Sequence, residues 1–133
     1  MWPEPLNPAV RQGLDELQLL FGELRVVPDG QGGARVTVAC VPLPPGLSRS
    51  ETWAGFMIPF NYDDVQVYGH HFPRDLRRAD GAEFAGPGFS YGGTWEEMPS
   101  LVVSRSSQNW RKGADTAALK LVKVIEFLKG RAS

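Results

Sequence analysis

The apolar residues near the two ends of the chain recur with the period of an α-helix, whereas those between them alternate as in β-strands. The first helical stripe, at steps of four, three and four, consists of Val10, Leu14, Leu17 and Phe21. Asn7-Pro8 is a typical helix start and Gly22 a typical end, which predicts a helix over residues 8–21. Such a chain must bury two helix faces against the segment between them.

The second helical stripe lies near the C-terminus. It consists of Ala118, Leu121, Val122, Ile125 and Leu128. Asp115-Thr116 is a good N-cap pair and Gly130 a typical end. Lys120 and Lys123 fall outside the apolar stripe, so we expect both on the solvent side of this helix.

Four segments between the helices have the composition and alternation of strands. They are residues 23–27, 34–41, 51–58 and 65–68. Glycine and proline punctuate them, which predicts an antiparallel four-stranded meander and an α+β fold in a single domain over residues 1–133. Cys40 is in phase with Val36 and Val38 on the second strand, so we expect it to be buried. From Gly69 to Gly113 the pattern dissolves into a long irregular flap, in which only Leu101-Val102-Val103 resembles a short strand. Long loops in compact domains tend to be functional.

Composition excludes several classes of function. A formal net charge of −1 at pH 7 argues against nucleic-acid binding, which needs a basic surface. No apolar run approaches the roughly 20 residues that span a bilayer, and the first residues lack the pattern of a signal peptide. Cys40 is the single cysteine, which excludes an internal disulfide. We therefore expect a cytoplasmic protein that binds neither nucleic acid nor membrane.

Three local features resemble the ubiquitin-conjugating (E2, or UBC) superfamily. Residues 43–62 resemble its third-strand region, where an apolar strand runs into a turn with proline and tyrosine. Residues 65–71 resemble its fourth strand, and residues 109–116 its tryptophan segment before a helix. Ser104-Arg105 ahead of Trp110 is similar to divergent bacterial E2-like families. The resemblance covers roughly residues 8–129 and implies a UBC-like fold of helix, four-stranded meander, flap and helix.

The chain departs from the family at its reactive centre. Working E2 enzymes carry a cysteine within the stretch that corresponds to residues 100–103, and no cysteine follows Val41 here. The His-Pro-Asn tripeptide is also missing, because no histidine follows His71. A thiolate forms the labile thioester of E2 chemistry, whereas serine is a poorer nucleophile. Two interpretations stay open: a naturally inactive variant that binds ubiquitin-like partners, or an atypical enzyme in which a flap serine replaces the cysteine.

Under the first interpretation, the partners are a ubiquitin-like protein, an E1-like protein or a catalytic E2, and the mechanism is binding and positioning. The candidate contacts are Phe89, Tyr91 and Trp95 in the aromatic, glycine-rich stretch, together with Arg105 and Trp110. Aromatic side chains on a flexible loop are typical protein-binding hot spots, although half of them can equally cover the sheet. The sequence indicates no cofactor and contains no glycine-rich nucleotide loop.

Under the second interpretation, one flap serine attacks an acyl group, with His70 or His71 assisting. The candidate serines are Ser100, Ser104, Ser106 and Ser107. A serine hydrolase is disfavoured, because there is no Gly-x-Ser-x-Gly elbow and the histidines lie far upstream. A zinc site at His70-His71 is also disfavoured, since adjacent strand residues point to opposite faces. Two interpretations of these histidines remain: one of them forms a hydrogen bond in the flap, or they are structural residues at the end of a strand.

Overall fold

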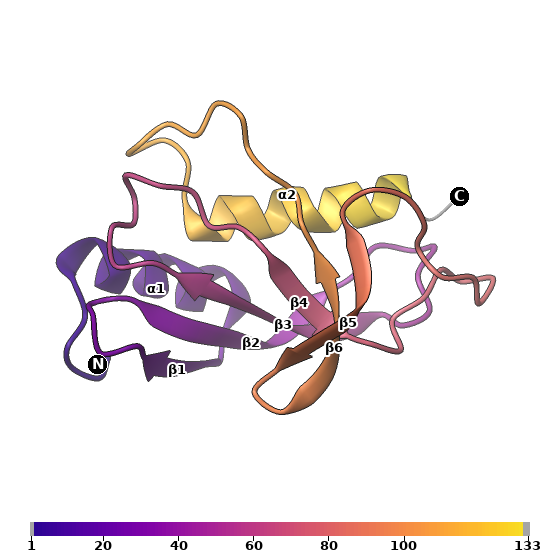
Figure 1. Ribbon diagram of the computed structural model, residues 1–133, viewed down its shortest axis with the longest axis horizontal. Helices are drawn as coiled ribbons and strands as arrows, with labels where there is room; N and C mark the ends of the chain where they lie inside the picture. Colours follow the sequence, from indigo (N-terminus) through magenta and orange to yellow (C-terminus); the bar gives the residue numbers. More distant parts are fainter. Residues whose placement is uncertain (1, 132–133) are drawn as a thin grey trace.

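The computed structural model describes residues 2–131 and shows an α+β fold (Figure 1). Its elements in chain order are α1 (Pro8–Phe21), β1 (Leu24–Pro28), β2 (Ala34–Pro42), β3 (Glu51–Ile58), β4 (His70–Pro73), β5 (Phe89–Trp95), β6 (Met98–Val103) and α2 (Ala117–Gly130). Both predicted helices and the first three strands are confirmed. Neither helix within residues 2–131 is long and apolar enough to cross a membrane.

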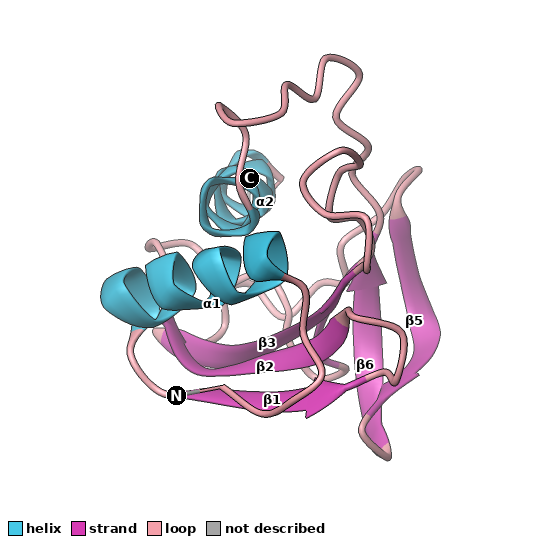
Figure 2. Cartoon of the chain, turned by 90° about the vertical axis from the view of Figure 1, so that its left-hand side faces the viewer, coloured by secondary structure: helices cyan, strands magenta, loops and turns pink. Residues whose placement is uncertain are grey.

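The strands form one six-stranded antiparallel sheet in the order β1-β2-β3-β4-β6-β5. Both helices cover the same face of this sheet, which we call the inner face; the other is the outer face (Figure 2). The core under the helices includes Val10, Leu14, Leu17, Val36, Phe56, Ile58, Phe72, Leu101, Leu121 and Val124. Burying these apolar side chains is the main driving force for this arrangement.

The prediction of a fourth strand at residues 65–68 is wrong. The structure has no strand there, and β4 begins two residues later at His70, after Gly69 with its φ of +83°. Val67 alone of that segment is fully buried, while Val65 and Tyr68 are exposed. The alternation of residues 65–68 therefore does not come from a strand; it comes from a loop that buries one side chain, Val67, in the core. The ladder forms where His70–Pro73 pairs with Val103–Ser100.

The expectation of an irregular flap is wrong over residues 89–100, whereas the strand predicted at Leu101–Val103 is confirmed as the end of β6. Together these residues form the β5–β6 hairpin. The turn between these strands is Glu96-Glu97, whose φ values of +48° and +70° fit the two-residue turns favoured in hairpins. Such turns usually have the sequence Asn-Gly, so the sequence Glu-Glu does not indicate a turn here. Gly93 is required by close packing, because a Cβ there would lie 2.4 Å from Val102 Cγ2. The hairpin thus depends on pairing that alternation in the sequence does not reveal.

Cys40 is exposed, which corrects the prediction of a buried thiol. The register of β2 against β3 shifts between Val38 and Val41, so Val41 takes the next inward position. Cys40 is left on the surface with its Sγ 3.0 Å from Glu51 Oε2. A bulge that inserts an extra residue reverses the facing of the residues after it, which explains the error.

Lys120 is buried at 2% relative exposure, which corrects its placement on the solvent side of α2. The apolar face of the helix runs along Ala117, Leu121, Val124 and Leu128, whereas Val122 is 40% exposed. Lys120 lies on the same side as Ala117 and Val124, at steps of three and four. Its aliphatic stem therefore packs against the core while its ammonium reaches the loop after β6.

Candidate functional site

The loop between β6 and α2, residues 104–115, forms the outer part of the predicted flap, and we call it the distal flap (Figure 1). Trp110 anchors it: the indole Nε1 donates to the Asp63 carbonyl at 2.9 Å, and the ring meets Tyr62 edge-on at 6.4 Å between centroids. The Gly113 amide donates to Asp63 Oδ2 at 3.2 Å. The distal flap is therefore held against the loop between β3 and β4.

Lys120 holds the middle of the distal flap from below. Its Nζ donates to Ser107 Oγ at 2.5 Å, to the Arg105 carbonyl, and to Gln66 Oε1 at 3.4 Å. An ammonium has three donors, so these partners satisfy it completely. A buried charge needs such pairing to be tolerated, and Lys120 is thus the central polar contact of the site.

Gln66 connects the same atoms from the other side. Its Oε1 accepts from the Ser107 amide at 2.6 Å, and its Nε2 donates to Ser106 Oγ at 3.1 Å. One side-chain amide therefore fixes both the backbone of Ser107 and the hydroxyl of Ser106. The position of Ser107 is set by Gln66 and Lys120 together.

The pKa of the Lys120 ammonium is lowered from 10.5 to about 8. Burial is the main cause, and the positive charges of Lys123 and Arg105 add to it. A lysine with such a pKa is partly deprotonated near neutral pH, whereas an ordinary surface lysine stays fully protonated there. Perturbed groups of this kind are frequent at functional sites.

A surface hollow of about 460 Å³ lies between the distal flap and α2. Ser106, Ser107 and Arg105 line it from the flap, and Lys120 and Phe127 from the helix. The Arg105 guanidinium lies over the Phe127 ring at 4.6 Å from its centroid. The hollow thus combines hydroxyls, cations, one aromatic face and the carboxylates of Asp115 and Glu126, a lining suited to a polar group of a ligand.

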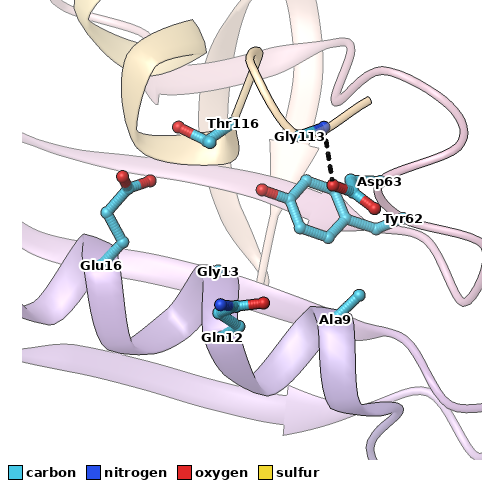
Figure 3. Close-up of a pocket in the computed structure, with 8 residues that line it drawn as sticks. All are labelled: Ala9, Gln12, Gly13, Glu16, Tyr62, Asp63, Gly113 and Thr116. Carbon is cyan, nitrogen blue, oxygen red and sulfur yellow. Dashed lines mark hydrogen bonds between the residues drawn. The ribbon is translucent and has the colours of Figure 1, made fainter. Parts of the chain in front are cut away.

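A second hollow, of about 390 Å³, separates α1 from the start of α2 (Figure 3). Tyr62 lies across it, and its hydroxyl accepts from the Ala117 amide at 2.9 Å. The Tyr62 ring fits against Gly13, where a Cβ would lie 3.0 Å from the ring. Burial raises the pKa of the Tyr62 hydroxyl, which keeps it neutral. These contacts join the two helices, and we interpret this hollow as structural.

The structure places the two histidines on opposite faces of the sheet. His70 is fully buried on the inner face, 5.0 Å from the Phe56 ring, and neither ring nitrogen has a hydrogen-bond partner within residues 2–131. Burial, with Lys120 and His71 nearby, lowers the pKa of His70 to about 3. His71 Nδ1 lies 2.9 Å from Ser100 Oγ on the outer face. Neither imidazole contacts Ser104, Ser106 or Ser107.

The predicted aromatic contacts are divided between packing and surface. Trp95 is 7% exposed; its Nε1 donates to Thr37 Oγ1 at 2.8 Å, and its ring lies on Gly55, which has no room for a Cβ. Phe89 stacks between Phe84 and Phe127 at 5.2 and 5.4 Å. These residues belong to β5, so they are a rigid strand where we expected a flexible loop. Phe89 is half-buried beside the first hollow.

Tyr91 is also half-buried and lies away from the distal flap. Its hydroxyl accepts from the Phe84 amide at 2.9 Å, and the Arg77 guanidinium lies 4.6 Å from its ring centroid. Of the five predicted contact residues, Arg105 alone is exposed on the distal flap, and Trp110 is its half-buried anchor. The structure therefore brings Arg105 and Phe89 together at the Phe127 ring, and it places Trp110 apart from them, against Tyr62. Tyr91 and Trp95 make their contacts elsewhere, with Phe84 and with Thr37.

Lys120 and Gln66 are the site residues that sequence reasoning missed. A lysine outside the most apolar stripe looks like a solvated residue, and a glutamine in a presumed strand carries no signal. The one available clue was that Lys120 is three and four positions from Ala117 and Val124, at the edge of the buried face. No protein-family model, curated protein or solved structure matches this chain, so the site rests on its own geometry.

Proposed function

We propose that this chain is an E2-like protein of a bacterial-type ubiquitin-like conjugation pathway, and that it binds a ubiquitin-like protein, an E1-like protein or an E2. The order of an N-terminal helix, an antiparallel sheet, a flap with Trp110 and a C-terminal helix supports this proposal. The resemblance of residues 43–62 and 109–116 to the family, and of Ser104-Arg105 to its divergent bacterial members, also supports it.

The observation that carries the proposal is the fixed, basic distal flap. Lys120, Gln66 and Trp110 hold its backbone in place, so its exposed side chains form a pre-organised surface. The stretch from residue 105 to 131 contains seven Lys or Arg, of which Lys120 is buried, and two Asp or Glu, in a chain whose net charge is −1. A positive surface of this kind favours a partner with an acidic face.

The chemistry of the only cysteine favours a binding role without a thioester. Cys40 lies on β2, far along the sheet order from the distal flap. Its hydrogen bond to the Glu51 carboxylate raises the pKa of the thiol, which disfavours the reactive thiolate. The role that we infer is therefore to bind and position a partner, with no sulfur in the site.

Binding measurements with charge-reversed variants test this role. We expect a ubiquitin-like or E1-like protein encoded in the same genome to bind the full chain in a calorimetric titration. Arg105→Glu should weaken that binding about 10-fold or more, which corresponds to about 1.4 kcal/mol. Arg25→Glu, an exposed arginine on the edge strand β1, is the matched control and should leave the affinity unchanged. No binding of either protein, or an equal effect of both variants, would contradict the proposal.

A further inference from the structure

We propose that Ser107 and Lys120 form a nucleophile–base pair that accepts an acyl group from a thioester. This is a covalent capability beyond partner binding. The pair is defined by geometry alone, whereas the choice of a thioester donor rests on the proposed function.

The contact between the two side chains is short and directed. Lys120 Nζ lies 2.5 Å from Ser107 Oγ, and its other contacts are the Arg105 carbonyl and Gln66 Oε1, both of which are acceptors. A neutral amine has two donors and one lone pair. It can therefore keep its bonds to Arg105 and Gln66 while its lone pair accepts the Ser107 hydroxyl proton. The same three partners satisfy Lys120 in both protonation states, as a base that cycles between them requires.

The pair is reachable by a substrate. Lys120 is buried, but it and the half-buried Ser107 both line the hollow of about 460 Å³ between the distal flap and α2. Arg105 and Lys123 line the same hollow, as do the carboxylates of Asp115 and Glu126, and Lys123 Nζ lies 3.4 Å from Asp115 Oδ1. Apart from Lys120 itself, Arg105 is therefore the cation of the lining that no carboxylate within residues 2–131 pairs with, and it can stabilise a developing negative charge. The site therefore has a nucleophile, a base beside it and cations on the same side.

The protonation equilibrium of Lys120 supports this role. Burial and the neighbouring cations lower its pKa to about 8, so a usable fraction of the amine is neutral near neutral pH. The histidines that the sequence suggested as assisting groups cannot act here. His70 is sealed in the core, and His71 lies on the outer face beside Ser100.

The other candidate serines lack this arrangement. Ser106 Oγ contacts the amide nitrogen of Gln66, which is a donor and cannot remove a proton. Ser100 is fully buried. Within residues 2–131, the Ser104 side chain forms no hydrogen bond with a basic group. Ser107 is thus the serine that the geometry selects.

The reaction is an acyl transfer with every atom accounted for. Neutral Lys120 takes the Ser107 hydroxyl proton as Oγ bonds to the thioester carbonyl carbon, which gives a tetrahedral oxyanion. The C–S bond then breaks, the thiolate leaves, and the Lys120 ammonium returns the proton to it as a thiol. The products are a Ser107 oxyester and a free thiol. A thioester suits this weak nucleophile because a thiolate leaves far more readily than an amine.

Mass spectrometry of the full chain after incubation with an aryl thioacetate tests the pair. We expect one acetyl group on Ser107, mapped by peptide fragmentation, that resists thiol reductant and is released by hydroxide. Ser107→Ala should lower the rate at least about 100-fold, whereas Ser50→Ala, a distant exposed serine, should not change it. Acetylation at Ser106, at a lysine or nowhere would overturn the proposal.

Variants of the base separate catalysis from structure. Lys120→Met should lower the acylation rate about 100-fold, and Lys120→Arg, which keeps a cation but cannot lose its proton, should do the same while the distal flap stays in place. In the unaltered chain the rate should rise with pH and level off above about 8. A rate that rises without levelling, or full activity in Lys120→Arg, would contradict the role of Lys120. The thioacetate assay needs no partner protein, and the calorimetric titration needs no acylation, so failure of either idea is recognised separately.

Discussion

Two serines of this chain each lie beside a basic side chain, one on either face of the sheet. On the inner side Ser107 Oγ lies 2.5 Å from Lys120 Nζ, and on the outer face Ser100 Oγ lies 2.9 Å from His71 Nδ1. By residue type the serine–histidine pair looks more catalytic. However, Ser100 is fully buried, and Trp95 lies against His71 with 4.8 Å between ring centroids.

The difference between the two pairs is access. Within residues 2–131 no helix covers the outer face (Figure 2). Trp95, the last residue of β5, instead packs on Gly55 of β3 and reaches Thr37 on β2, and its ring lies against His71. The inner pair sits at the edge of α2, where the distal flap leaves a hollow. Proximity of a serine to a base thus identifies a packing contact in one place and a candidate reactive centre in the other.

Removing the cover from the outer pair should have the largest effect on stability. Trp95→Ala deletes a buried indole that packs on Gly55 and donates to Thr37, and we expect it to lower the free energy of unfolding by about 3–5 kcal/mol. Urea denaturation followed by circular dichroism measures this change. Trp53→Ala is the matched control: Trp53 is half-exposed on β3, so its loss should cost clearly less. Equal losses would mean that Trp95 is no special cover for the outer face.

Protonation of the inner histidine should have the next largest effect. The folded-state pKa of His70 is about 3, below the ordinary value of 6.5, because burial disfavours the charged ring. Its contribution to stability is therefore complete above pH 6.5 and is lost as the pH falls toward 3. The loss amounts to about 2 kcal/mol at pH 5. Urea denaturation at pH 7 and at pH 5 should show that the free energy of unfolding of the unaltered chain falls with pH. In His70→Leu this fall should be smaller by about 2 kcal/mol.

The outer histidine provides the comparison for this measurement. Burial also lowers the pKa of His71, but its ring is only half-buried. His71→Asn should therefore keep most of the acid sensitivity of the unaltered chain. If His70→Leu instead followed the pH profile of the unaltered chain, the inner ring would have to be solvated or paired, and the contrast between the faces would fail.

The helices and the first three strands could be predicted because their signals are local. The stripe from Val10 to Phe21 lies within one helix, and each N-cap residue directly precedes its helix. Thr116 Oγ1 accepts from the Leu119 amide at 3.2 Å, whereas Asn7 occupies the N-cap position without a side-chain cap hydrogen bond. Their agreement with the structure follows from periodicity and capping, which act over one or two turns. The flap serines were likewise recognised as candidates, without a means of choosing among them.

The parts that could not be predicted depend on residues distant in sequence. The two strands of the β5–β6 hairpin are joined by a Glu-Glu turn. A bulge in β2 against β3 places Cys40 on the surface. Lys120 is buried because the distal flap folds back over it. No periodic pattern encodes any of these. The base of the proposed pair was missed for the same reason, since Ser107 and Lys120 are 13 residues apart and meet only through the loop.

The smallest effect distinguishes the two serines directly. Ser100→Ala leaves His71 Nδ1 without its partner under Trp95, which should lower the free energy of unfolding by about 1 kcal/mol while acylation at Ser107 continues unchanged. Ser107→Ala should abolish acylation but leave the free energy of unfolding nearly unchanged, because its half-exposed site admits water to replace the lost hydroxyl. Urea denaturation and the thioacetate assay on both variants measure the two quantities. If Ser100→Ala abolished acylation with its fold intact, the reactive serine would lie on the outer face, and access would not be what separates the pairs.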